Sequence, residues 1–394
     1  MNSLVGRFSL EFSKAQVRME SFRYLGFSLF PSDLTRLRVL GVLLFCLSSM
    51  TGCYRLGLSP SYEGPVERPS RLNEYYSQGE SYYSYTEEVT KREERFSIKN
   101  IVIESSAGTL SIDYYYQDKP SDDLILVFPV LGGRPVLSAY FAHYFAEQGY
   151  DAAIIARVND FKDKSNFLRI EEILRRGVVR DRIALDFFEK EYGKKDFGTF
   201  GMSRGGINVA ISAGIDPRLR YNVIVMGGSG LVDIFENSKE SRVAKFVDEV
   251  AEDHDWPKEE MFRYLRKNVV TDPQYLAKHV DAKNTLLMIS TCDNAVPYTS
   301  GLQLREEIGR PETIVLMAGH KTSVFFTQFL PAVPPLREAC IFPFGYVELE
   351  ALHFFNEHFD RGTFVSAMKL APFRLLQFMP SAIARFWTLV NGTL

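Results

Sequence analysis

A serine flanked by two glycines stands near the middle of the chain, where residues 201–205 read Gly-Met-Ser-Arg-Gly. The stretch before it is apolar and strand-like, and the stretch after it is helix-like. A serine on such a tight strand-to-helix turn exposes its hydroxyl, and side chains two positions away would collide with the turning chain unless both are glycine. Ser203 is therefore a candidate nucleophile, although five-residue patterns of this kind also arise by chance.

A serine hydroxyl is a weak nucleophile at neutral pH and needs a base within hydrogen-bond reach. His320 follows a strand-like stretch at 313–317, so we expect it in a loop at the carboxyl edge of a sheet, over Ser203. The other five histidines fall on helix-like segments or in a helical region: His143, His254, His279, His353 and His358. His320 is therefore the predicted base.

The base needs an acid that fixes its tautomer. Asp293 follows a strand-like stretch at 285–290 and should emerge at the same sheet edge, whereas Asp233, one strand earlier, is the alternative. We predict Asp293, and the chain order is then nucleophile, acid, base.

The histidines also bear on metal binding. His353 and His358 are five residues apart, so on a helix they point away from each other and lack the i, i+4 spacing of a zinc-binding helix. Glu357 lies four residues after His353 and could share a metal with it, but a packed or solvated helix face explains the pair as well. We expect neither a metal nor another cofactor.

The elements that position these residues alternate along the chain. Helix-like spacing occurs at 136–148 and 180–192. Strand-like stretches occur at 97–104, 109–116, 124–128, 152–156, 197–202, 221–226, 285–290 and 313–317. The first two form a predicted hairpin. Short apolar strands alternating with helices predict an α/β fold with a mostly parallel sheet that is covered on both faces.

Residues 229–283 interrupt this alternation with three helix-like segments and no strand. Asp255 and Asp272 shortly precede prolines and are predicted N-caps of the second and third segments. We expect a helical cap over the substrate pocket, although plain crossover helices remain the alternative.

The motifs at 201–205, 293–297 and 319–320 together resemble the nucleophile, acid and base turns of α/β-hydrolases, and the resemblance covers a domain at 95–360. It implies cleavage of an ester or related acyl bond through an acyl-enzyme. It also implies an oxyanion hole formed by the N–H of Arg204 and one from the loop after residue 128, with Leu131 expected and Val130 as the alternative.

Residues 1–52 resemble an N-terminal extension with a bacterial lipoprotein signal peptide. Arg36 and Arg38 precede a short apolar run at 39–47, and Met-Thr-Gly-Cys follows at 50–53. The resemblance implies that Cys53 carries lipid and that the protein is anchored in the cell envelope, with outer-membrane sorting favoured because Tyr54 replaces the aspartate of retained lipoproteins. The alternative is an ordinary signal peptide or a short buried helix.

Two flanking segments have distinctive compositions. Residues 53–94 are polar and rich in proline, tyrosine and serine, which predicts a solvated tether, with docking of the tyrosines as the alternative. Residues 361–394 contain basic and aromatic side chains but no Asp or Glu. This composition suits a membrane interface and equally suits a final helix packed on the body, and Pro372 and Pro380 would interrupt a single helix.

The composition of the whole chain limits its function. Its 394 residues are 46% hydrophobic and carry a net charge of -3, which gives no electrostatic reason to expect nucleic acid as a partner. We expect a membrane-anchored serine hydrolase acting on a small-molecule or lipid acyl ester. An acyltransferase with the same residues, or a binding or scaffold protein that keeps the fold without turnover, is the alternative.

Overall fold

The computed structural model describes residues 53–77, 81–119, 121–130, 136–157, 163–327 and 345–390. The predicted signal peptide within 1–52 and the expected oxyanion donor Leu131 lie outside these described residues.

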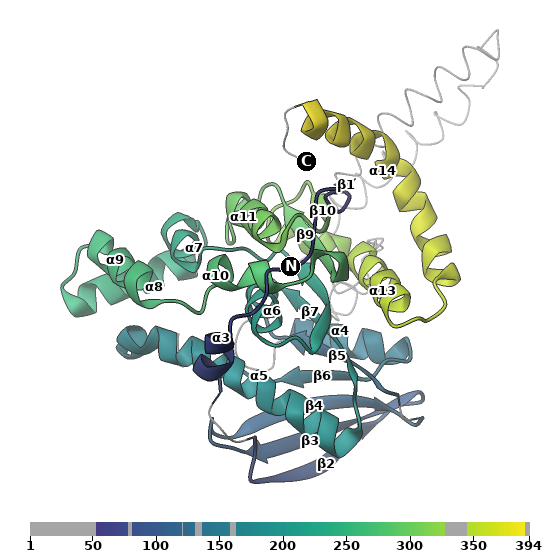
Figure 1. Ribbon diagram of the computed structural model, residues 1–394, viewed down its shortest axis with the longest axis horizontal. Helices are drawn as coiled ribbons and strands as arrows, with labels where there is room; N and C mark the ends of the chain where they lie inside the picture. The colour runs from purple at the N-terminus through teal and green to yellow at the C-terminus, as the bar shows by residue number, and fades with distance from the viewer. Residues whose placement is uncertain are drawn as a thin grey trace, which may run out of the picture. The chain divides into compact units, whose positions relative to one another are not determined.

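The described strands form one ten-stranded sheet in the order β1-β10-β9-β8-β7-β5-β6-β4-β3-β2 (Figure 1). Neighbours from β10 to β6 run parallel, whereas β1 pairs antiparallel with β10, and the strands from β6 through β4 and β3 to β2 pair antiparallel in turn. The bounds are β1 Cys53–Leu56, β2 Ser84–Arg92, β3 Phe96–Glu104, β4 Leu110–Gln117, β5 Asp123–Phe128, β6 Ala152–Ile155, β7 Asp196–Met202, β8 Leu219–Val225, β9 Thr285–Ser290 and β10 Glu312–Leu316. This is the predicted α/β architecture.

Helices cover both faces of the sheet because successive side chains of a strand point to opposite sides. In β5, Leu124, Leu126 and Phe128 belong to the apolar cluster on the face that α5 (Ile170–Tyr192), α6 (Arg204–Ile215) and α11 (Tyr298–Ile308) cover. The alternate residues Ile125 and Val127 belong to the cluster on the face that α4 (Val136–Glu147), α13 (Tyr346–His358) and α14 (Phe364–Val390) cover. The two apolar clusters fix the sheet as the rigid support of its loops.

The segment between β8 and β9 is helical. It forms α7 (Leu231–Asn237), α8 (Ser241–His254), α9 (Lys258–Asn268) and α10 (Pro273–Leu276), and a separate apolar cluster joins α7, α8 and α9 to the start of α5. Asp272 caps α10 by accepting a hydrogen bond from the Gln274 N–H. The cap predicted for Asp255 is wrong, because this residue ends α8 in the left-handed conformation and α9 begins after Pro257.

The segment 53–94 differs from the solvated tether that its composition predicts. Its first strand, β1, extends the sheet beside β10, and Arg55 pairs with Glu312 on β10 and with Glu350 on α13. Farther along, the Tyr62 hydroxyl donates to Asp281 at 3.1 Å, and Tyr76 is buried against Thr271. Long-range partners therefore hold a segment whose local sequence specifies little structure.

Strand β2 occupies the end of the same segment and was not predicted. All nine of its residues are exposed, so it lacks the alternation of apolar and polar residues that identifies a half-buried strand. It pairs antiparallel with β3, with Lys99 of β3 bound to Glu87 at 2.8 Å. Cross-strand pairing, rather than burial, holds this edge.

Helix α14 runs from Phe364 to Val390 with Pro372 and Pro380 inside it. The expectation that these prolines would interrupt the helix is therefore wrong. Each proline removes one backbone hydrogen bond and favours bending, and the helix is visibly curved in Figure 1. Within the described part of the chain, no helix combines the length and apolarity that crossing a bilayer requires.

Candidate active site

Ser203 lies on the turn between β7 and α6 with strained backbone angles, φ 57° and ψ -123°. A Cβ atom on Gly201 would lie 2.3 Å from the carbonyl oxygen of Gly205, and one on Gly205 would lie 2.3 Å from that of Phe128. Both distances are far below contact, so only glycine fits at either position. The structure thus gives the physical reason for the glycines around Ser203.

Three predicted side chains meet at the carboxyl ends of β7, β9 and β10. Ser203 Oγ lies 2.9 Å from Nε2 of His320, and Nδ1 of His320 lies 2.7 Å from Oδ2 of Asp293. With the proton on Nδ1, His320 donates to Asp293 and its Nε2 is free to accept the Ser203 hydroxyl proton. This geometry is that of a serine, a general base and an orienting acid.

The carboxylate of Asp293 is held from both sides. Its Oδ1 accepts backbone N–H groups from Ala295 at 2.8 Å and Val296 at 2.9 Å, which leaves Oδ2 directed at His320. The Asp293 side chain is 2% exposed, whereas that of His320 is 20% exposed. The acid is therefore fixed inside the fold, and the imidazole remains accessible.

The loops that carry Asp293 and His320 are joined to each other. The backbone N–H of Thr291 donates to Leu316 at 2.9 Å, and that of Cys292 donates to Ala318 at 3.0 Å. The hydroxyls of Ser290 and Ser323 lie 2.7 Å apart. These contacts extend the β9–β10 pairing beyond the sheet and fix the spacing of the two site residues. The sequence pattern gave no signal for the serine pair.

The alternative acid and the remaining histidines lie elsewhere. Asp233 is half exposed on α7 and pairs with Arg266 at 3.0 Å. His353 lies 2.9 Å from the hydroxyl of Ser366 on α14, which matches packing better than metal binding. Among the described residues, no group of three or more His, Cys, Asp or Glu side chains is arranged to hold a metal ion.

Of the two expected oxyanion donors, the structure describes Arg204 but not Leu131. Arg204 is the first residue of α6, directly after Ser203, so its N–H belongs to the helix end that favours negative charge. Leu131 lies outside the described residues, whereas the alternative Val130 packs partly buried against the core. The role of each as a donor stays a prediction.

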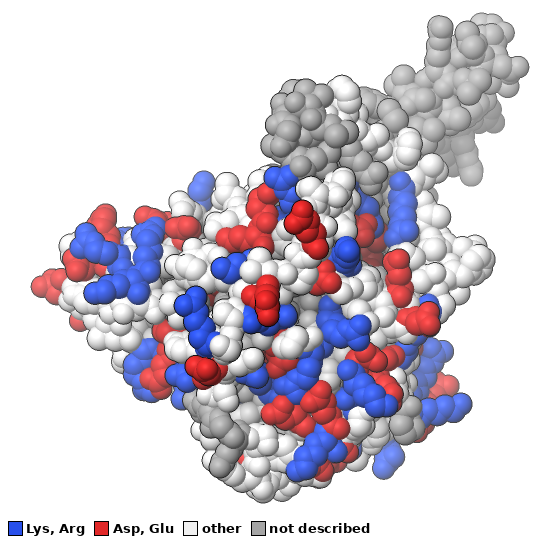
Figure 2. All heavy atoms as spheres, in the orientation of Figure 1, with Lys and Arg blue, Asp and Glu red and all other residues white. Residues whose placement is uncertain are grey.

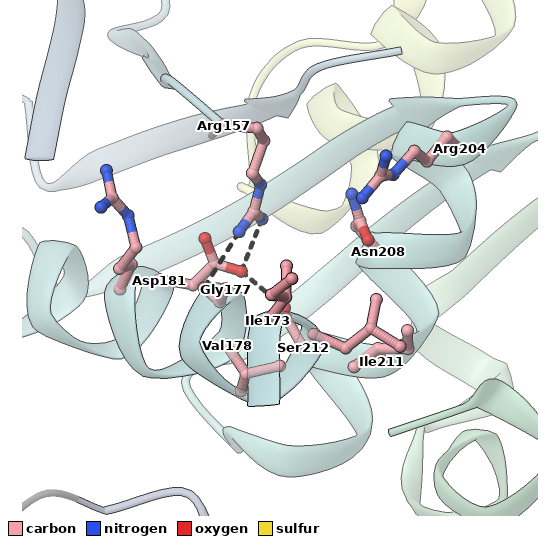
Figure 3. Close-up of a pocket in the computed structure, with 11 residues that line it drawn as sticks. Arg157, Ile173, Gly177, Val178, Asp181, Arg204, Asn208, Ile211 and Ser212 are labelled. Carbon is pink, nitrogen blue, oxygen red and sulfur yellow. Dashed lines mark hydrogen bonds and ion pairs between the residues drawn. The ribbon is translucent and has the colours of Figure 1, made fainter. Parts of the chain in front are cut away.

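The side chain of Arg204 enters a cavity between α5 and α6 (Figure 3). The cavity is small, with room for about 30 Å³ of solvent, and it opens to the surface. Its described charged lining comprises Arg157, Arg180, Arg204 and Asp181, and Arg157 binds Asp181 at 2.7 Å. Burial, together with the nearby charge of Arg157, lowers the pKa of Arg204 to about 9. The described lining thus favours negative charge beside the nucleophile turn.

Sequence reasoning missed this cavity. Arg157 follows β6, while Asp181 and Arg180 lie in the middle of α5, so the sequence offers no motif that connects them with residue 204. Figure 3 shows Arg157 directed at Asp181 of α5, and it shows Arg204 and Asn208 on the first turns of α6. Only the packing of α5 on α6 brings these groups together.

Cys53, the predicted site of lipid attachment, is the first residue of β1 and is 3% exposed. Burial and the nearby Glu350 raise the pKa of its thiol to about 12. A lipid on this sulfur therefore requires the start of β1 to lie outside the apolar cluster that it occupies here. The lipidation of Cys53 stays a prediction.

Comparisons with known proteins find similarity only at the level of structure. No family model matches the sequence, and no curated protein matches it. An acetyl xylan esterase from Paenibacillus sp. R4 superposes with a TM-score of 0.50 at 17% identity, over 64% of this chain and 87% of the other. Acetyl xylan esterase 1 from Thermoanaerobacterium sp. JW/SL YS485 gives 0.49 at 14% identity, over 67% and 94%.

Acylaminoacyl peptidase from Pyrococcus horikoshii gives a TM-score of 0.48 at 15% identity, over 68% of this chain and 42% of the other. At such identities the likeness concerns the fold and not the substrate. The parallel central strands, the strand-to-helix turn at Ser203 and the superposition at 0.50 agree with one another. The chain has the α/β-hydrolase fold.

Proposed function

We propose that this protein is a serine hydrolase that cleaves a carboxylic ester or related acyl bond. The observation that carries the proposal is the hydrogen-bonded series from Ser203 through His320 to Asp293, with distances of 2.9 and 2.7 Å. The strained turn at Ser203 adds support, because the glycines around it keep the hydroxyl at the end of the sheet.

The reaction proceeds in two stages. The Ser203 hydroxyl attacks the substrate carbonyl while His320 accepts its proton at Nε2, and the resulting imidazolium is stabilised by Asp293. The bond to the leaving group then breaks, and His320 returns the proton to the leaving oxygen. Water attacks the acyl-enzyme by the same route and releases the acid, so Ser203 is regenerated.

The oxyanion of each tetrahedral intermediate needs hydrogen-bond donors. The backbone N–H of Arg204 is the proposed first donor, and Leu131 is the proposed second. Loss of one such donor typically costs about 10²- to 10³-fold in rate. The substrate is a small-molecule or lipid acyl ester.

We also propose that the chain is attached to the bacterial cell envelope through lipidated Cys53. The proposal rests on the short apolar run at 39–47 and the small residues before this cysteine. Such an anchor would keep the hydrolase at a membrane surface, where lipid esters are within reach of the site.

Labelling with a fluorophosphonate probe tests the catalytic proposal. The wild-type chain should be labelled and Ser203→Ala should not, since loss of the nucleophile costs up to about 10⁶-fold in turnover. Ser61→Ala, a serine remote from the site in sequence, serves as the matched control and should label like wild type. A folded wild-type chain that resists the probe would instead support a binding protein on the same fold.

Where labelling succeeds, the fate of the acyl group separates the remaining candidates. The hydrolase should release free acid from a p-nitrophenyl ester without any added acceptor. Release that depends on an added alcohol or amine, with the acyl group recovered on that acceptor, would replace the hydrolase with an acyltransferase.

A further inference from the structure

Three uncharged polar side chains of helix α14 are turned toward the body of the protein. The inward polar residues are Ser366, Gln377 and Ser381, which hydrogen-bond to His353 at 2.9 Å, to Tyr346 at 3.1 Å and to the backbone N–H of Arg55 at 3.0 Å. Leu370 and Phe373 accompany them on the same side. The helix is therefore docked in one orientation by specific partners on α13 and β1.

The opposite side of α14 is apolar and faces outward. Its members are each 55% to 74% exposed: Phe364, Val365, Met368, Leu375, Phe378, Ile383 and Phe386. At about 100° per residue these positions fall within an arc of about 140°, which makes one continuous stripe. We call these seven residues the α14 stripe. Its polarity is the reverse of that of an ordinary surface helix.

An exposed apolar stripe of this size marks a surface that meets a membrane or another protein. In Figure 2 the surface that α14 forms at the right is mainly white, whereas the lower half of the view carries many charged side chains. Residues 361–394 include no Asp or Glu, and Lys369 is exposed next to the stripe. Aromatic and aliphatic side chains beside a basic group suit a layer of anionic lipid headgroups.

The position of α14 in the fold also favours a membrane as the partner. The helix packs against β1 through the contact between Ser381 and Arg55, and the apolar run at 39–47 ends shortly before β1 begins. With the lipid proposed at Cys53, the chain would enter the domain from a bilayer at β1, which is the strand that α14 contacts.

We propose that α14 lies in the interface of an anionic membrane, with the α14 stripe in the acyl boundary and its polar side on the protein. The proposal is independent of the activity of Ser203. It gives the domain a second membrane contact, which would fix how the domain is oriented on the bilayer rather than merely keep it nearby.

A polarity-sensitive nitrobenzoxadiazole label at position 378 of the full chain tests the proposal. The label is placed through Phe378→Cys after the four native cysteines are replaced by serine or alanine. Mixed with vesicles of phosphatidylcholine and phosphatidylglycerol at 3:1, the label should gain fluorescence about threefold and shift to the blue as it enters a less polar region. The same label at Leu168→Cys, an exposed apolar position outside α14, should not change.

A second measurement uses binding rather than a label. Leu375→Ser with Phe378→Ser should weaken vesicle binding about tenfold or more relative to the matched pair Leu168→Ser with Val270→Ser. Both pairs change exposed residues, so equal melting temperatures will show that folding is intact. No response of the label at 378, or equal vesicle binding by the two pairs, would overturn the proposal. A label response that rises with protein concentration without vesicles would assign the stripe to a second copy of the chain.

Discussion

The two carboxylate oxygens of Asp293 have separate partners. One accepts two backbone N–H groups, and the other accepts the His320 Nδ1–H. An acid whose position is fixed by the backbone cannot rotate away when the imidazole becomes charged.

Replacing Asp293 with asparagine should therefore lower kcat by about 10⁴-fold, because the amide would hold the wrong tautomer of His320. The measurement is the steady-state hydrolysis of a p-nitrophenyl ester. Asp233→Asn is the matched control, and it should leave kcat nearly unchanged because Asp233 pairs with Arg266 on the surface of the helical segment. The reverse ranking would assign the acid to Asp233.

At the scale of elements, the turn between β7 and α6 can form only because Gly201 and Gly205 have no side chains. The tight approach of Gly201 to Gly205, and of Gly205 to Phe128, lets α6 begin directly above β5 and β7. Its cost is the strained backbone of Ser203. A methyl group at either glycine would push the helix away from the strands.

Gly201→Ala should accordingly destabilise the fold by about 3 kcal/mol and abolish labelling of Ser203. Gly57→Ala is the control, because a Cβ atom there would have no neighbour within 4 Å. It should change the free energy of unfolding by less than about 0.5 kcal/mol. Urea unfolding of the two variants measures the difference, and equal midpoints would show that the turn can relax around the added methyl group.

The sequence predicts those elements whose own residues specify them. The buried strand β9 is found at the predicted residues 285–290, and β5 differs by one residue, because an uninterrupted apolar run marks a strand that is covered on both faces. The three site residues were predictable because each directly follows such a strand or forms a recognisable turn. For these strands and site residues, the local sequence pattern is enough to predict the position in the fold.

Other elements were not predictable because distant residues determine them. Tyr62 and Asp281 are 219 residues apart in the sequence, and no local pattern in 53–77 predicts their contact. Strand β2 is exposed throughout and mostly polar, so only its pairing with β3 reveals it. Helix α14 continues through two prolines, and partners on α13 and β1 hold Ser366 before the first proline and Ser381 just after the second.

At the scale of the whole molecule, lipid attachment at Cys53 predicts a firm association with membranes. The Cys53→Ser chain should move from the membrane fraction to the soluble fraction after washing with high salt, because several acyl chains are lost. Contact through α14 alone rests on one apolar stripe, so it should be weaker than attachment by several acyl chains. Partitioning that is unchanged in the variant would move the anchor to the C-terminal segment or to the uncleaved apolar run at 39–47.

The pairing of β1 with β10 has a consequence for how the molecule is made. Arg55 and Glu312, which join these strands, are separated by 257 residues. Synthesis delivers β1 first, yet its partner strand exists only after nearly the whole domain has been made. Closures over such distances are slow, and until then β10 presents an open edge to which other chains could add. Among the described strands, the first to be synthesised is thus among the last that can pair in the sheet.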